Sequence, residues 1–207
     1  MLKRLIGLGI VIGGLSVLGA VAPKVNEAAS SMELVSPDDF HVDPGHSTII
    51  FKIRLHSVTN FYGRVNAPQG SFLLTDDPAE SHVEIKIATK NIDGGLKTRN
   101  QYLAGVDFFN AREYPEASFK SESVTRIDDE TFEATGSFTM RGKTVPMTVR
   151  LRDYAEADMG RLGYRAGFEV RFTVKRSDFE MTAHLDDGQL GDEVEIIVAI
   201  DGGRANK

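Results

Sequence analysis

The sequence contains no cysteine and no tryptophan among its 207 residues. Without cysteine the protein can form no disulfide, no thiolate metal site and no lipid attachment to cysteine. This absence does not decide the compartment, because exported proteins also fold without disulfides. Positive charge is scarce as well: 24 lysines and arginines against 30 aspartates and glutamates leave a net charge of −6. That balance argues against a nucleic-acid partner or an anionic membrane surface, both of which attract basic patches.

The motifs of several enzyme classes are also missing. The chain has no G-x-S-x-G nucleophile elbow and no phosphate-binding loop, and its folded part has no G-x-G-x-x-G dinucleotide fingerprint. Its carboxylate groups at 128–130 and 186–187 are typical of solvated turns. No two histidines have the four-residue helical spacing of a zinc site; they are His41, His46, His56, His82 and His184. We therefore expect no catalysis, no metal and no cofactor.

The longest hydrophobic run lies at the N-terminus. Lys3 and Arg4 precede an uncharged segment, residues 5–22, which is typical of a secretory signal peptide. Ala20-Val21-Ala22 predicts cleavage after residue 22, and a second candidate region extends to about residue 31. Loss of residues 1–22 removes two positive charges, so the net charge of −6 becomes −8.

A retained anchor is the alternative, because eighteen apolar residues are just long enough to span a bilayer. We favour cleavage, and so expect a periplasmic or secreted protein with no stable membrane span. Residues 23–39 contain two prolines and no periodicity, which predicts a linker. A single folded domain is expected over residues 40–201, with a short tail at 202–207.

Alternation of apolar and polar side chains runs through most of the folded domain. This two-residue period predicts strands with one apolar and one polar face. The clearest segments are 47–56, 83–89, 132–140, 162–174 and 194–200. Pro146 argues against a central, fully hydrogen-bonded strand around it. Because the first and last strands are long and apolar on one face, we predict an eight-stranded antiparallel barrel, which leaves no exposed edge.

The alternation breaks down between Thr98 and Ser121. Leu103, Val106 and Phe108 or Phe109 recur three or four residues apart, which predicts a short helix near residues 98–113 that Pro115 would end. An amphipathic helix needs an apolar surface to cover. In an all-strand chain, the mouth of the barrel is the surface we expect.

The interior of an eight-stranded barrel either fills with side chains or holds one small ligand. Both interpretations fit the composition, in which apolar residues make up 41 % of the chain. A helix over the mouth favours a cavity, and methionine and phenylalanine suit a flexible apolar guest. The candidate lining residues are Phe51, Ile53, Phe108, Phe109, Phe119, Phe138, Met140, Met147, Phe168, Phe172 and Phe179.

Several short motifs occur in a fixed order along residues 40–201. They are Phe40-x-Val42-Asp43-x-x-His46-Ser47, Arg99-x-x-x-Leu103, Asp107-Phe108-Phe109 before Tyr114-Pro115, Phe119-x-Ser121, Phe138-Thr139-x-x-Gly142 and Arg176-Ser177-Asp178-Phe179. Together they resemble the YceI family of exported bacterial proteins. The resemblance implies a lipocalin-like barrel whose elongated cavity holds a polyisoprenoid or another long amphiphile. It also implies a carrier or sequestering protein instead of a catalyst.

The chain departs from the family pattern at three positions. Asn100 and Tyr102 stand where the family often has Asp and His, and Glu180 stands where it often has Gly. These differences bear on the head group of the ligand. The polar candidates near the opening are Arg99, Tyr102 and Arg176, with Asp107 orienting one arginine, since an arginine fork suits a pyrophosphate or a carboxylate.

Several alternatives stay open at this point. The two arginines and Asp107 could instead form a structural salt bridge that holds the helix on the barrel. The protein could be an enzyme acting on such a lipid, a ligand-free barrel used for interactions, or a carrier of quinones or fatty acyl derivatives. The sequence also leaves open whether two chains form a homodimer.

Overall fold

A computed structural model describes residues 38–204 of the chain. The expected signal peptide, nearly all of the expected linker and residues 205–207 lie outside the described residues. Within 38–204, no helix has both the length and the apolar character needed to cross a membrane.

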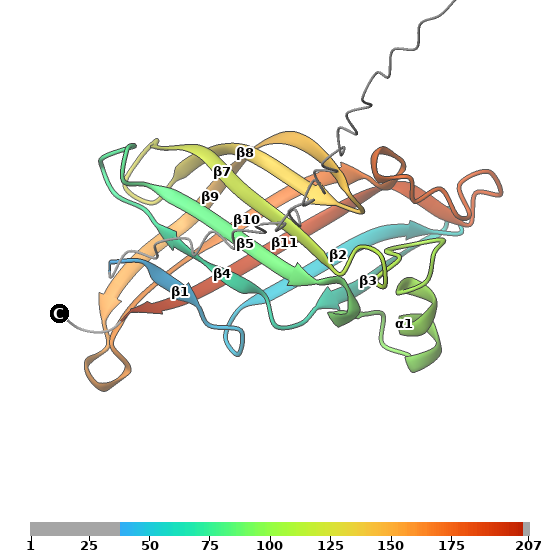
Figure 1. Cartoon of the computed structure of the whole chain (residues 1–207), viewed down its shortest axis with the longest axis horizontal. Helices are drawn as coiled ribbons and strands as arrows, with labels where there is room; N and C mark the ends of the chain where they lie inside the picture. Colours follow the sequence, from blue (N-terminus) through green and yellow to red (C-terminus); the bar gives the residue numbers. More distant parts are fainter. Residues whose placement is uncertain (1–37, 205–207) are drawn as a thin grey trace, which may run out of the picture. The chain divides into compact units, whose positions relative to one another are not determined.

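The described part is an all-β barrel with one α-helix at one end (Figure 1). The helix, α1, spans Lys97–Leu103, and short 3₁₀ turns lie at Thr89–Asn91, Gly160–Leu162 and Arg176–Phe179. The strands are β1 (Phe40–Val42), β2 (Thr48–Leu55), β3 (Thr59–Val65), β4 (Gln69–Leu73), β5 (His82–Ala88), β6 (Ile92–Asp93), β7 (Glu116–Arg126), β8 (Phe132–Met140), β9 (Lys143–Asp158), β10 (Tyr164–Lys175) and β11 (Leu190–Arg204).

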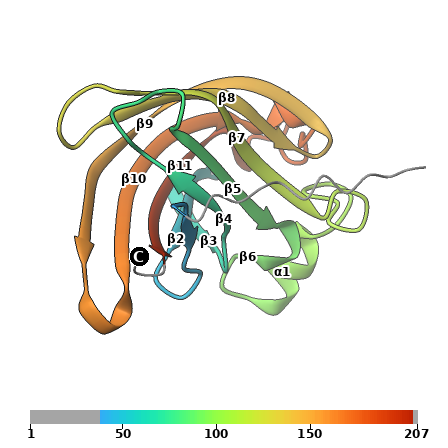
Figure 2. The same ribbon diagram turned by 60° about the vertical axis from the view of Figure 1, so that its left-hand side comes forward.

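The sheet closes on itself because β1 pairs with strands on both of its sides. Its partners are β4 and β11, which completes the ring β1-β4-β5-β7-β8-β9-β10-β11. This ring has eight antiparallel strands, as the alternation predicted, and Figure 2 shows them curving around a common interior. Three further strands continue the sheet: β2 pairs with β11 next to the position where β1 does, β3 pairs with β2, and β6 pairs with β3. Strand β11 continues to Arg204, three residues beyond the expected end of the domain at 201.

One end of the barrel is filled with aromatic side chains. Phe40 stacks on Phe72 with 5.4 Å between ring centroids, and Phe72 meets Phe168 edge to face at 5.0 Å. Gly202 makes room for them, because a Cβ atom there would lie 2.6 Å from the Phe72 ring. The interpretation of a filled core therefore applies to this end, where Phe40, Phe72 and Phe168 are at most 5 % exposed.

An ion-pair network holds the seam between β1, β10 and β11. Arg165 donates to Asp43 at 2.9 Å and contacts Asp201 at 2.6 Å. This guanidinium holds the pKa of the Asp43 carboxyl well below its ordinary value, with further hydrogen bonds from His46 and the Gly45 N–H. The stabilising contribution of Asp43 is therefore fully present above its unfolded-state pKa. It is lost only in acid, as the pH falls toward the lower folded-state pKa.

Two details of the strands agree with their local sequence and one differs. Both residues of the β8–β9 turn, Arg141 and Gly142, have positive φ angles of 49° and 69°, as a type I′ hairpin requires. Pro146 of β9 lies opposite β8, and β9 pairs with β10 only over residues 151–158. Proline has no N–H group, but at this position no hydrogen bond to β10 is lost, because the two strands are not paired there. Strand β10 begins two residues later than predicted, because Leu162 lies exposed in the preceding turn.

Helix α1 is shorter than the helix predicted near residues 98–113. It ends at Leu103, well before Pro115, and Gly105 follows within a series of tight turns. The Asn110 N–H donates to the Gly105 carbonyl, which folds the chain back on itself. As a result Val106 points into solvent with 68 % of its surface exposed, and the predicted helical face of Leu103 and Val106 does not form.

Asn100 fixes the helix to the barrel. Its side-chain oxygen accepts a hydrogen bond from the Gly94 N–H at 2.7 Å, and its amide nitrogen donates to Asp93 of β6 at 2.9 Å. Asp93 also accepts from the Gly95 N–H, and these bonds lower the pKa of its carboxyl. An asparagine can both donate and accept, which lets one side chain tie the helix to the strand and the turn.

Candidate functional site

The end of the barrel that carries α1 contains a cavity of about 460 Å³. This volume lies within the range of roughly 300–1,000 Å³ typical of small-molecule sites. Inward-facing residues of β2, β3 and β5–β11 form its wall, and α1 with the turns after it covers one side. Several side chains that point inward are nonetheless only partly buried, as an unfilled interior requires. They are Phe51, Ile85, Ile87, Phe119, Met147, Phe172, Ile196 and Val198.

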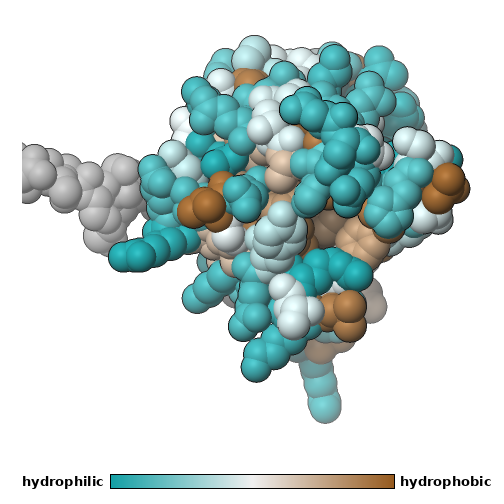
Figure 3. All heavy atoms as spheres, turned by 90° about the vertical axis from the view of Figure 1, so that its right-hand side faces the viewer, coloured by the Kyte–Doolittle hydropathy of each residue, from teal (hydrophilic) through white to brown (hydrophobic). Residues whose placement is uncertain are grey.

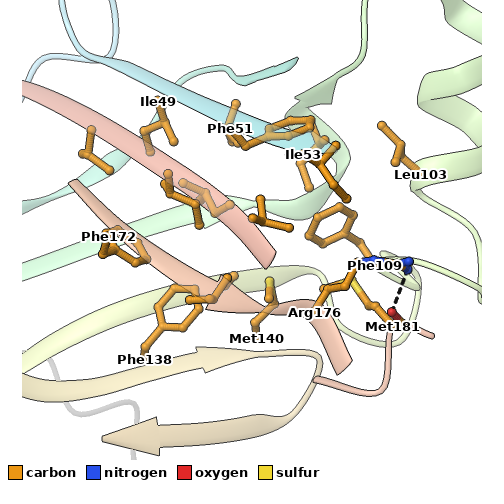
Figure 4. A pocket seen from close by; sticks show the side chains of 18 of the residues that line it. Ile49, Phe51, Ile53, Leu103, Phe109, Phe138, Met140, Phe172, Arg176 and Met181 are labelled. Carbon is orange, nitrogen blue, oxygen red and sulfur yellow. Dashed lines mark hydrogen bonds between the residues drawn. The ribbon is translucent and has the colours of Figure 1, made fainter. Parts of the chain in front are cut away.

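All but one of the candidate lining residues border this cavity. Figure 4 shows Phe51 and Ile53 of β2 on one side of the space and Phe138 and Met140 of β8 on the other. Phe109 stands at the end where α1 lies. The residues that border the cavity are Phe51, Ile53, Phe108, Phe109, Phe119, Phe138, Met140, Met147, Phe168 and Phe172.

Phe179 is the exception, because it lies behind the wall instead of in it. Its side chain is 1 % exposed, and its ring packs edge to face on Phe138 with 5.5 Å between centroids. The residue belongs to the 3₁₀ turn Arg176–Phe179 and not to a strand, so the alternation that places strand residues does not apply to it. Phe179 therefore supports the cavity wall without reaching the cavity.

Arg99 is an exposed cation at the mouth of the cavity. Its guanidinium lies 4.7 Å from the centroid of the Phe61 ring, a cation–π contact, and donates one hydrogen bond to the Gly94 carbonyl. A guanidinium carries five N–H donors. The structure therefore leaves most of the Arg99 donors facing water at the opening, where a polar head group could replace that water.

Tyr102 joins α1 to the loop between β10 and β11 across the mouth. Its hydroxyl lies 3.1 Å from Nε2 of His184, and Nδ1 of His184 lies 3.1 Å from Asp187. In the tautomer whose Nδ1–H donates to Asp187, Nε2 accepts the Tyr102 O–H. Tyr102 also packs edge to face on Phe108 at 5.0 Å. No spacing in the sequence could identify this contact, because Tyr102 and His184 are far apart in the chain.

Arg176 borders the cavity, but its guanidinium is committed to the protein backbone. The side chain is 3 % exposed, and burial lowers its pKa, an effect that Asp192 partly offsets. Its N–H groups donate, at 2.6 to 3.1 Å, to the carbonyls of Met181, Ala183, Leu190 and Gly191; Figure 4 draws one of these bonds. Arg176 therefore holds the two ends of the β10–β11 loop together, which is a structural role. Its guanidinium is not available to bind the head group of a ligand.

Asp107 does not orient an arginine. Its side chain is exposed, and within residues 38–204 it forms no ion pair with Arg99 or Arg176. The tight turns after α1 place it on the outside of the chain. The alternative of a structural salt bridge is also not seen in residues 38–204: Arg176 is bound by backbone carbonyls, and Arg99 contacts the Gly94 carbonyl and the Phe61 ring.

The sequence-based choice of bulky residues missed most of the smaller lining side chains. The alternation of the strands already contained the signal for them, since they occupy the same inward positions. They are Ile49, Leu55, Val65, Val83, Ile85, Ile87, Val149, Leu151, Val170, Val174, Val194, Ile196 and Val198. Met181, His184 and Gln189 come from the β10–β11 loop, where no periodicity could predict them.

The arrangement is suited to holding an apolar chain with a polar end. Each methylene group transferred from water to such a wall contributes about 0.8 kcal/mol. The polar lining groups Arg99, Tyr102, His184 and His56 gather at the mouth. Residues 38–204 contain no cluster of three or more histidine, aspartate or glutamate side chains placed to bind a metal ion.

Comparison with known proteins supports this geometry. A UPF0312 protein from Pectobacterium carotovorum subsp. carotovorum is 30 % identical over 178 residues, which cover 86 % of this chain and 91 % of the relative. A UPF0312 protein from Yersinia pestis is 32 % identical over 167 residues, covering 79 % and 85 %.

Two solved structures share the fold. BcnA from Burkholderia cenocepacia has a TM-score of 0.63 at 24 % identity, over 77 % of this chain and 98 % of its own. A polyisoprenoid binding domain from Saccharophagus degradans, implicated in plant cell wall breakdown, has a TM-score of 0.62 at 11 % identity, over 80 % and 98 %. The family model described as the YceI-like domain matches residues 40–201. This chain therefore belongs to the YceI family.

Proposed function

We propose that this protein is a carrier or sequestering protein that holds a polyisoprenoid or a similar long-chain amphiphile inside its barrel. The observation that carries the proposal is the apolar cavity of about 460 Å³, which occupies one half of a barrel whose other half is tightly filled. The shared fold of a polyisoprenoid binding domain supports the same ligand class. The N-terminal hydrophobic run supports export to the periplasm, where such a lipid needs shelter from water.

The tail of the ligand supplies most of the affinity in this proposal. Ten buried methylene groups correspond to about 8 kcal/mol before the costs of ordering the chain and the ligand. Affinity should therefore rise smoothly with chain length until the cavity is full. Selectivity for one lipid over another then depends on the few polar groups at the mouth.

Recovery of a bound lipid is the direct test of this function. Protein purified from its own host is extracted with solvent, and the extract and the intact complex are both analysed by mass spectrometry. We expect a co-purified lipid with the mass of a long chain, and its identity separates polyprenols from quinones and fatty acyl derivatives. An empty protein that also fails to protect a fluorescent fatty acid or prenol from water would rule out the carrier function.

Enlarging a residue of the wall should change stability and binding in opposite directions. Val198 borders the cavity between Ile49 and Val170 on the neighbouring strands. In Val198→Phe the larger ring fills empty space, so we expect a gain of about 1 kcal/mol and a melting temperature roughly 2–4 °C higher. Uptake of a long fatty acid should weaken about tenfold. The control is Ile197→Phe, because the neighbouring side chain of Ile197 points outward and its enlargement should leave uptake unchanged. Unchanged uptake by Val198→Phe would show that the ligand does not occupy the space beside Val198.

Arg99 should recognise an anionic head group. A hydrogen bond to a charged group contributes about 1.5–3 kcal/mol. We therefore expect Arg99→Gln to weaken binding of a long-chain fatty acid about tenfold, with little change for the alcohol of equal chain length. Fluorescence competition measures both ligands. Arg112→Gln is the matched control, because Arg112 is exposed nearby but does not border the cavity. Equal losses of affinity for the acid and the alcohol would show that Arg99 stabilises the opening of the cavity without recognising the charge of the head group.

A further inference from the structure

Exposed apolar side chains lie around the opening of the cavity. Val58 at the tip of the β2–β3 hairpin is 77 % exposed, and Leu96, Tyr102 and Val106 on and around α1 are 46 to 68 % exposed. The two segments are neighbours, because Arg99 of α1 stacks on Phe61 of β3. We call residues 54–62 and 94–106 together the mouth face.

The charge of the mouth face is opposite to that of the chain. It contains Arg54, Lys97 and Arg99 and no aspartate or glutamate, which gives it a charge of +3 in a chain of −6. Four carboxylates lie at its border: Asp93 and Asp107 flank the second segment in the chain, and Asp186 and Asp187 belong to the loop that Tyr102 contacts. Figure 3 views this end of the barrel, where hydrophobic residues stand singly among polar ones. The net charge of −6, which argues against an anionic partner for the chain as a whole, does not describe these two segments.

The opposite end of the barrel offers an internal comparison (Figure 1). Ile127, Met159 and Leu162 are also exposed there, at 53 to 72 %. Their turns, however, are rich in carboxylates: residues 128–130 are all acidic, and Asp158 precedes Met159. Arg126 and Arg161 also lie in these turns, but they are outnumbered by the four carboxylates. The same degree of apolar exposure thus occurs at both ends, with a net negative charge at this end and a net positive charge on the mouth face.

We propose that the mouth face docks on a lipid bilayer that contains anionic lipids. Apolar side chains of this kind insert at the level of the head groups, and each nearby lysine or arginine strengthens attraction to an anionic surface. Negative charges at the opposite end of the barrel oppose docking only weakly, since charges beyond about 10 Å are largely screened at 0.1 M salt, whereas the carboxylates at the border of the mouth face oppose it directly. Docking in this orientation places the opening of the cavity against the lipid. The proposal rests on the proposed carrier function for its purpose, but docking is measured without any guest.

The absence of tryptophan makes a site-specific test possible. A single tryptophan introduced into this chain is the only source of tryptophan fluorescence. Val58→Trp reports on the mouth face and Leu162→Trp on the opposite end, and both positions are more than 70 % exposed, so neither disturbs the core. Vesicles of phosphatidylcholine with phosphatidylglycerol should shift the emission of Val58→Trp to the blue, and brominated lipid should quench it. Leu162→Trp should show neither effect.

Charge variants complete the design. In the Val58→Trp background, Lys97→Gln should lower vesicle partitioning about fivefold, and high salt should lower it further. Arg161→Gln, which removes an exposed cation beside Leu162, should leave partitioning unchanged. Every variant carries the same N-terminal segment, so differences between the two reporters arise in the barrel.

The outcomes separate docking from ligand binding. An unchanged emission of Val58→Trp, equal shifts for both reporters, or equal binding to phosphatidylcholine alone would each overturn the proposal. Uptake of a fluorescent fatty acid is measured on the same proteins without vesicles. Uptake without docking refutes the docking proposal alone, whereas docking without uptake supports it and counts against the carrier function.

Discussion

The variant Phe138→Glu is expected to lose lipid uptake, with binding of a fluorescent fatty acid or prenol weakened at least about 100-fold. Phe138 lies in the cavity wall of β8, next to Phe172 at 5.9 Å and Phe179 at 5.5 Å between ring centroids. A glutamate there places a carboxyl group against the apolar tail of the guest. Burial of an unpaired polar group costs roughly 2–7 kcal/mol, and about 2.7 kcal/mol already corresponds to 100-fold.

Protonation gives this prediction a second readout. An apolar surrounding raises the pKa of a carboxyl group, because it disfavours the charged form. Uptake by Phe138→Glu should therefore recover in part as the pH falls and the introduced glutamate becomes neutral. Thr139→Glu, whose side chain points outward beside Thr144, should bind like the unmodified protein. Unimpaired binding by a folded Phe138→Glu protein would show that this face does not contact the guest.

Arg176→Met is expected to cause the largest loss of stability, about 3 kcal/mol or more. The methionine keeps the apolar stem of the side chain but leaves four backbone carbonyls without their donors. A hydrogen bond from a charged group is worth about 1.5–3 kcal/mol, and a buried acceptor left unsatisfied adds its own cost. For a domain of this size the melting temperature should fall by roughly 6–12 °C.

Arg176→Lys separates charge from geometry. Lysine keeps the positive charge but presents its donors from a single atom, so it cannot reach carbonyls on both ends of the β10–β11 loop. We expect an intermediate loss of stability and faster proteolysis within residues 181–191. Because that loop carries His184 to the mouth, Arg176 is a positioning residue for the Tyr102 contact. Melting temperatures within about 1 °C of the unmodified protein for both variants would contradict this assignment.

The strands and the closed barrel could be predicted because alternation is a local property. In an extended chain, successive side chains point to opposite faces whatever the rest of the molecule does. The inward positions of β8, the β8–β9 turn at Arg141-Gly142 and the incomplete ladder around Pro146 all followed from neighbouring residues. The family motifs over residues 40–201 led to the same fold.

The same alternation could not tell which half of the barrel is hollow. Phe132 and Phe138 occupy equivalent inward positions of β8, yet Phe132 is completely buried among its neighbours and Phe138 borders the cavity. Whether space is left beside a phenylalanine of β8 depends on the side chains that the other strands place opposite it. At one end Gly202 lets Phe72 fill the centre, whereas at the other end the rings of Phe51, Phe119 and Phe172 border the space without filling it.

The sequence alone therefore determined the strands, their inward faces and the closure of the barrel. The tertiary structure decided the partners: Arg176 meets backbone carbonyls, Arg99 stays at the opening, and Phe179 lies behind the wall. It also brought together the segments that make the mouth face positive in an acidic protein. The physical reason is that side-chain direction is set within a few residues, whereas packing and hydrogen bonding depend on groups that meet only after the chain has folded.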